Sequence, residues 1–100
     1  MASRLQLHEE LCALLGSKNV YFQPPRSMQY PCIKYSRSGI DQRRANDGLY
    51  KKTNKYELIV IDYDPESEIP EKILAYFPMC GFDRGYIADN LNHFVLTLYF

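Results

Sequence analysis

Two pairs of residues have the types and spacing that catalysis or metal binding needs. His8 and Cys12 lie four residues apart, so a helix would place both on one face, where an imidazole can activate a thiol. Leucines share that face, so a packed cysteine and a half-buried histidine are the stronger expectation. Asp62 and Asp64 share one strand face, but no histidine or third carboxylate follows at ligand spacing. Asp64 precedes Pro65, which is typical of a helix cap, so we expect no metal site.

The other common catalytic signatures are absent from the sequence. It contains no glycine-rich dinucleotide motif, no phosphate-binding loop, no nucleophile elbow and no zinc-protease motif. Asp83-Arg84 and Asp89-Asn90 are typical of a local ion pair and a turn in a final hairpin. We therefore expect a protein that is not an enzyme and needs no cofactor.

The cysteines indicate a reducing compartment. Cys12, Cys32 and Cys80 are odd in number and have no close-paired spacing, so neither a disulfide framework nor a zinc site is expected. No apolar run approaches the roughly 18 residues of a membrane span, and the N-terminus does not resemble a signal peptide. We expect synthesis in a cytoplasm and no membrane partner.

Length and composition indicate one globular domain, residues 1–100. Apolar residues make up 46% of the chain and charged residues 24%, which is ordinary globular usage. Nine tyrosines and five phenylalanines suit half-buried sheets and interfaces. The net charge is zero, which argues against a generic nucleic-acid binder and leaves self-association open.

Apolar spacing predicts helices and strands in alternation. Residues 4–15 form an amphipathic helix that ends at Gly16, with Glu9 and Glu10 facing away from its apolar stripe. A second helix is capped by Asp64 or Ser67 and ended by Pro78. The predicted strands are residues 20–23, 30–37, 53–63, 81–87 and 93–100.

The order helix, three strands, helix, two strands predicts an α+β fold. We expect a mostly antiparallel sheet of about five strands with two helices packed on it. The strand 53–63 is apolar on both faces, so it should be central and covered on both sides. The polar segment Ser38–Tyr50 should be a long loop.

The neutral total hides two segments of opposite charge. Lys34 to Lys55 holds seven bases and two acids, a net charge of +5, and Glu57 to Asp89 holds eight acids and two bases, a net charge of −6. Three interpretations stay open: the two blocks neutralise each other within one subunit, they join neighbouring subunits head to tail, or the basic block meets phosphates. The candidate interface or lumen residues are Arg37, Asp41, Arg43, Arg44, Lys51, Lys52, Asp62, Asp64, Glu66 and Glu68.

Four short segments of the sequence carry a family resemblance. Residues 20–25 read VYFQPP, 30–35 YPCIKY, 59–65 IVIDYDP and 89–94 DNLNHF. These strings and their order, over nearly the whole chain, resemble the tail-terminator or tail-completion proteins of tailed phages and prophages. Better-known tail terminators are longer, so this chain looks like a compact version.

The resemblance implies a structural role in the virion. Such proteins form a homo-oligomeric ring, usually a hexamer, that caps the tail tube and binds a neck or head-completion protein at the tail–head junction. DNA passes through the lumen without sequence-specific binding. The protein would be made in the cytoplasm of the host bacterium. Another neck ring (a stopper or adaptor) and a small non-enzymatic protein-binding module remain as alternatives.

For the subunit contact we expect one copy's bases to meet the next copy's acids. The bases are Arg43, Arg44, Lys51 and Lys52, and the acids are Asp62, Asp64, Glu66 and Glu68.

Overall fold

The computed structural model describes residues 4–23, 28–44 and 50–100, with the backbone alone at 41–44 and 50–52. In these residues the chain forms two helices and a five-stranded sheet in the order β1-β2-β3-β5-β4. The elements are α1 (Arg4–Leu15), β1 (Val20–Phe22), β2 (Cys32–Arg44), β3 (Tyr50–Asp62), α2 (Ile69–Tyr76), β4 (Cys80–Ala88) and β5 (Leu91–Tyr99). Only the β1–β2 pair is parallel within this sheet, so the predicted α+β class and element order are confirmed.

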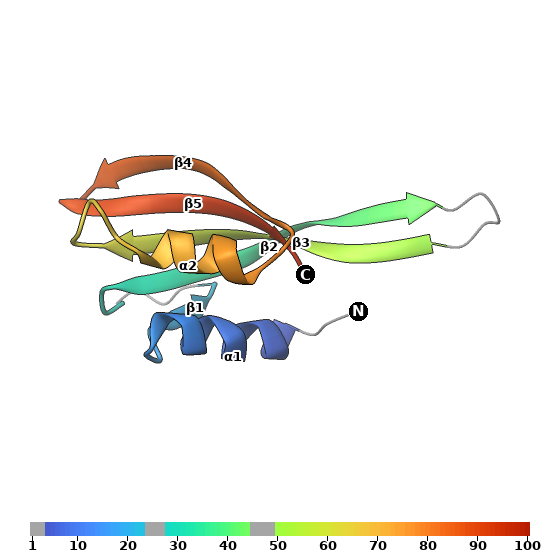
Figure 1. Ribbon diagram of the computed structural model, residues 1–100, viewed down its shortest axis with the longest axis horizontal. Coiled ribbons are helices and arrows are strands. Elements are labelled where there is room, and N and C mark those ends of the chain that lie inside the picture. Colours follow the sequence, from blue (N-terminus) through green and yellow to red (C-terminus); the bar gives the residue numbers. More distant parts are fainter. Residues whose placement is uncertain (1–3, 24–27, 45–49) are drawn as a thin grey trace.

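Both helices pack on the same face of the sheet (Figure 1). A row of buried side chains crosses the sheet there, formed by Tyr35 on β2, Leu58 on β3 and Leu96 on β5. The helices cover this row with Leu7, Leu11, Ile73 and Phe77. Burying large apolar side chains on one face is the main source of stability for a domain of this size.

Helix α1 has its predicted bounds and buries Leu7 and Leu11, although Leu5 at its start is 65% exposed. It ends where Gly16 takes a left-handed conformation (φ 78°) and donates from its amide to the Cys12 carbonyl at 2.9 Å. On the polar side of the helix, Glu10 Oε1 accepts a hydrogen bond from the Tyr76 hydroxyl at 3.0 Å. This bond joins α1 to the end of α2, which the sequence pattern of one helix alone cannot reveal.

Strand β3 is central, as predicted, but it is not covered equally on both faces. Neither of the two described helices lies on the second face, where Glu57 and Ile59 stay partly exposed. The buried part of that face is smaller: Cys32 and Ile61 lie among Met28 and other side chains from nearby loops and strands, and Val95 is buried opposite Ile59. The expectation of full coverage was wrong because an apolar side chain also stays stable when strand neighbours shield part of it.

The segment Ser38–Tyr50 is not the loop that the sequence predicts. After a bulge at Ser38, β2 continues to Arg44 and pairs with β3 from Gly39 opposite Lys55 to Arg44 opposite Tyr50. We call the two paired segments, 39–44 and 50–55, the arm; residues 45–49 lie outside the described residues. The arm projects from the body and makes the molecule 51 Å long and 23 Å wide (Figure 1). Its polar sequence fits a hairpin that no helix covers.

The turns around α2 and β4 also differ from the sequence pattern in part. The N-cap position of α2 is Glu68 rather than Asp64 or Ser67, and Glu68 makes no side-chain capping bond, but the Ser67 hydroxyl accepts a hydrogen bond from the Ile69 amide at 3.3 Å. The helix ends at Tyr76, before Pro78, as expected. The predicted turn between β4 and β5 is confirmed, because Asp89 and Asn90 have φ values of 52° and 61°, as a tight hairpin requires.

Candidate assembly surfaces

The basic candidates gather on the arm. In the strand register Arg43 lies opposite Lys51 and Arg44 lies opposite Tyr50, with Lys52 one position further from the tip. The side chains of these residues and of Asp41 lie outside the described residues. Arg37 is exposed on β2, just before the bulge at the base of the arm.

The acidic candidates lie in one connection, residues 62–68, which we call the acidic loop. Asp62 Oδ1 accepts a hydrogen bond from the Asp64 amide at 3.2 Å, and Asp64 Oδ1 accepts one from the Glu66 amide at 2.9 Å. Each aspartate therefore holds a turn, as its residue type favours. Glu66 and Glu68 are exposed. Among the described residues no group of three histidine, cysteine or acidic side chains is arranged to hold a metal ion.

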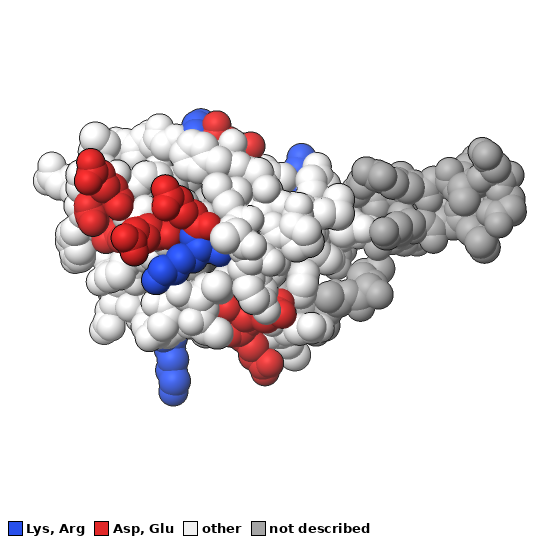
Figure 2. All heavy atoms as spheres, in the orientation of Figure 1, with Lys and Arg blue, Asp and Glu red and all other residues white. Residues whose placement is uncertain are grey.

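The arm and the acidic loop lie at opposite ends of the molecule. Strand β3 connects them, and from Lys52 to Asp62 it rises roughly 33 Å at about 3.3 Å per residue. Figure 1 shows the same separation: β2 and β3 extend to one side, and the connection from β3 to α2 lies at the other end. Figure 2 shows acidic side chains gathered over that connection and over α2. Charges in water are screened beyond about 8–10 Å at physiological salt. The bases of the arm therefore cannot neutralise the acidic loop of their own subunit, so that interpretation of the charge pattern fails for these residues.

An apolar groove lies beside the acidic loop. It has a volume of about 490 Å³ and runs between the loop, α2 and β4. Leu74, Phe82 and Phe94 line it together with prolines, and Glu66 and Glu71 add carboxylates. Sequence analysis missed this groove because residues far apart in the chain form it. The acidic end thus offers both negative charge and an apolar surface.

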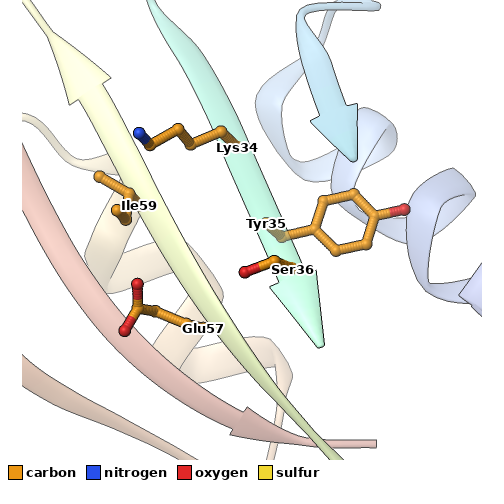
Figure 3. Close-up of a pocket in the computed structure, with 5 residues that line it drawn as sticks. All are labelled: Lys34, Tyr35, Ser36, Glu57 and Ile59. Atoms are coloured by element: carbon orange, nitrogen blue, oxygen red, sulfur yellow. The ribbon is translucent and has the colours of Figure 1, made fainter. Parts of the chain in front are cut away.

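The second face of the sheet holds a small hollow between β2 and β3 (Figure 3). Lys34, Ser36, Glu57 and Ile59 line it, while the Tyr35 side chain points to the other face, toward α1. Its volume is about 140 Å³. Sites for small molecules usually measure about 300–1,000 Å³, so this hollow is too small to bind a typical cofactor.

The residues that resembled a thiol–imidazole pair do not form one. His8 Nδ1 lies 2.8 Å from the Tyr35 hydroxyl oxygen, which also accepts a hydrogen bond from Arg4 Nη1 at 3.4 Å. Burial raises the pKa of the Cys12 thiol, and a reactive cysteine needs a lowered pKa. Burial likewise raises the pKa of Cys32 and of Cys80 to about 11. Cys12 and His8 therefore have packing roles.

Comparison with known proteins adds no relative to these observations. No protein-family model, curated protein or solved structure matches this chain. No helix in the described part of the chain is long and apolar enough to cross a membrane. The two charged ends and the groove are therefore the features on which a function can be argued.

Proposed function

We propose that this chain is a virion structural protein, a tail terminator that caps the tail tube as a homo-oligomeric ring and joins it to the head or neck. One observation carries the proposal: the basic arm and the acidic loop lie at opposite ends of an elongated subunit (Figure 1). A ring needs two unlike, complementary surfaces on each subunit, because its contacts are heterologous. The resemblance of the sequence strings to tail-terminator proteins supports the same role.

In this proposal the arm of one subunit lies along the acidic loop and the groove of the next. Opposite charges steer the encounter and set the register. The apolar floor of the groove supplies burial, and Ile40, 54% exposed on the arm, is an apolar side chain that can enter it. Bases that the contact leaves free would face DNA in the lumen through phosphate attraction alone.

The capping mechanism is geometric. A ring bound to the growing end of the tube occupies the surface to which the next tube ring would add, and its other side binds a neck or head-completion protein. No catalytic group, metal or cofactor takes part in this mechanism.

Electron microscopy and sedimentation of the purified protein test the ring. We expect the unmodified protein to form rings that weaken as salt rises, because salt screens the contact. R43E/R44E should abolish the rings, and adding E66K/E68K should restore them by exchanging the charges across the contact. K18E, a reversal in the exposed turn after α1, should leave the rings unchanged.

Three outcomes contradict the proposal or its contact. A protein that stays monomeric at every concentration favours the small protein-binding module. Rings that survive R43E/R44E exclude the arm as the contact. Rings that form but fail to stop growth of the cognate tail tube point to a stopper or adaptor ring instead.

A further inference from the structure

The two outer strands of the described sheet protect their edges differently. Strand β1 has three residues, Pro24 and Pro25 follow it in the sequence, and α1 packs close to it. Strand β4 has nine residues with neither proline nor lysine, and its outer side pairs with no described strand. Short strands, prolines and lysines are the usual protection against edge pairing. Strand β4 lacks these three, and its protection is limited to the adjacent charges Asp83 and Arg84 and a bulge between Phe82 and Arg84.

Apolar side chains are concentrated along this open edge. Met79, Phe82, Tyr86 and Ile87 are all large and exposed, and Ile87 is 75% exposed. No other element of the described chain exposes as many large hydrophobic side chains. An exposed apolar edge strand is a surface to which another strand can add.

The sequence of β4 is complementary to itself when it is read in the opposite direction. An antiparallel pair centred between Asp83 and Arg84 places each Asp83 opposite Arg84 of the second copy. It also places Phe82 opposite Gly85, and Tyr86 opposite Gly81. Each aromatic side chain thus faces a glycine; the space beside Gly81 is open, whereas the chain's own Phe82 and Phe94 rings lie just under 4 Å from the position of a Cβ on Gly85.

In this register the two residues of each opposing pair also lie on the same face of the sheet. Phe82 and Gly85 pair with Leu96 and Phe94 of β5, which share the helix-covered face. Gly81 and Tyr86 pair with residues of the other face, Thr97 and His93.

The irregularity in β4 fits the same register. The pairing with β5 shifts at Asp83, whose carboxylate accepts a hydrogen bond from the Thr97 hydroxyl. The Asp83 side chain therefore lies on the second face, together with that of Arg84. In the proposed pair the two bulges meet at the two-fold axis and stay in phase. A shift by one residue in either direction would oppose side chains on different faces, and a shift by two would bring the bulges out of phase.

We propose that β4 pairs antiparallel with β4 of a second copy of this chain, with the two-fold axis between Asp83 and Arg84. The charge complementarity of Asp83 and Arg84 selects a second copy as the occupant. The result is a continuous ten-stranded sheet with an isologous interface. This inference does not rest on the proposed ring, although Phe82 of β4 also lines the groove that the ring contact uses.

The proposed register places Cys80 opposite Ile87 of the second copy. A thiol introduced at position 87 therefore tests the register directly. I87C, made in a C12S background, should oxidise to a covalent dimer with a disulfide between positions 80 and 87. The two positions lie roughly 23 Å apart along one strand, whereas a disulfide needs Cα atoms within about 7 Å, so the bond must join two chains.

The matched control is A88C in the same background, one residue out of register and on the other face. We expect little or no 80–88 disulfide from this variant. A disulfide between the two introduced thiols at position 87, or equal cross-linking in A88C, overturns the proposed register. Absence of any covalent dimer in I87C overturns the pairing itself.

A charge exchange measures the same contact without a covalent bond. D83R and R84D each create two like-charge pairs across the axis and should weaken dimerisation at least about tenfold in sedimentation equilibrium. D83R/R84D restores opposite charges in the same register and should return the dissociation constant to within about threefold of the unmodified protein.

Circular dichroism of each variant checks that the fold is kept, since Asp83 also accepts the Thr97 hydrogen bond. A double variant that is as weak as the single variants, or single variants that dimerise normally, contradicts the proposal. R43E/R44E should leave this dimer intact, so failure of the ring and failure of the β4 pair are distinguishable.

Discussion

Leu58 and Ile59 are neighbours on β3 and similar in size, yet their surroundings are opposite. Leu58 is fully buried on the face that α1 and α2 cover. Ile59 lies on the second face, partly exposed beside Lys34 and Glu57. One strand thus separates a face that holds the fold together from a face on which no described helix packs.

The difference teaches where this protein can bind partners. The helix-covered face takes up most of the buried apolar side chains, so it supplies most of the stability. The arm, the acidic loop and the β4 edge contribute little to that core. Changes to them should alter assembly while the subunit stays folded, and the predictions that follow test the division.

The largest expected effect comes from the covered face. L58A should lower the free energy of unfolding by about 2–5 kcal/mol, because it removes a fully buried side chain and leaves a cavity. I59A, on the next residue, should cost less than about 1.5 kcal/mol, because water already reaches that side chain. Urea denaturation measures both, and equal losses would contradict the division between the faces.

The next largest effect is a pH dependence of stability caused by the Cys32 thiol, which is buried at one corner of the second face. Burial raises the pKa of Cys32 from 9.0 to about 11, so the fold favours the protonated thiol. That contribution is complete below pH 9 and is lost as the pH rises from 9 to 11, which should cost about 1–2 kcal/mol.

Urea denaturation across this pH range measures the loss for Cys32. C32A should reduce this decline in stability and leave the part that Cys80 causes, whereas C12S should change it less, because the Cys12 thiol is only partly buried. If the free energy of unfolding falls with pH in C32A as steeply as in the unmodified protein, water reaches this corner of the second face.

The smallest effect concerns a polar group at the margin of the covered face. Y35F removes the hydroxyl that lies between His8 and Arg4, and should cost about 0.5–1.5 kcal/mol. Y63F removes a hydroxyl from an exposed tyrosine and should leave the stability unchanged within about 0.5 kcal/mol. Thermal or urea unfolding compares them, and a cost in Y63F as large as that in Y35F would remove the distinction.

The elements that sequence reasoning predicted well are those with a strong local signal. Helix α1 has an apolar stripe and a terminal glycine, and the last hairpin has Asp89-Asn90 at its turn, so local sequence decided both. The arm was missed because its polar residues contain turn signals and no apolar alternation. Its strands are stable only because each satisfies the backbone of the other, which is a pairing between distant residues.

The assembly surfaces show the same limit. The segregation of charge was readable by counting, and it named the arm and the acidic loop. Whether those charges meet within one subunit depends on strand length and direction, which the count does not contain. The groove beside the acidic loop combines residues from a loop, a helix and two strands, so no single segment signals it.

The sequence alone determined the α+β class, the order of the elements, the absence of common catalytic motifs and the two blocks of opposite charge. These follow from local spacing and composition, which act within a few residues. Only the tertiary structure decided that both helices cover one face, that the arm extends away from the body and that β4 is left open at an edge. Those outcomes depend on which distant segments pack together, because burial and strand pairing are properties of the folded chain.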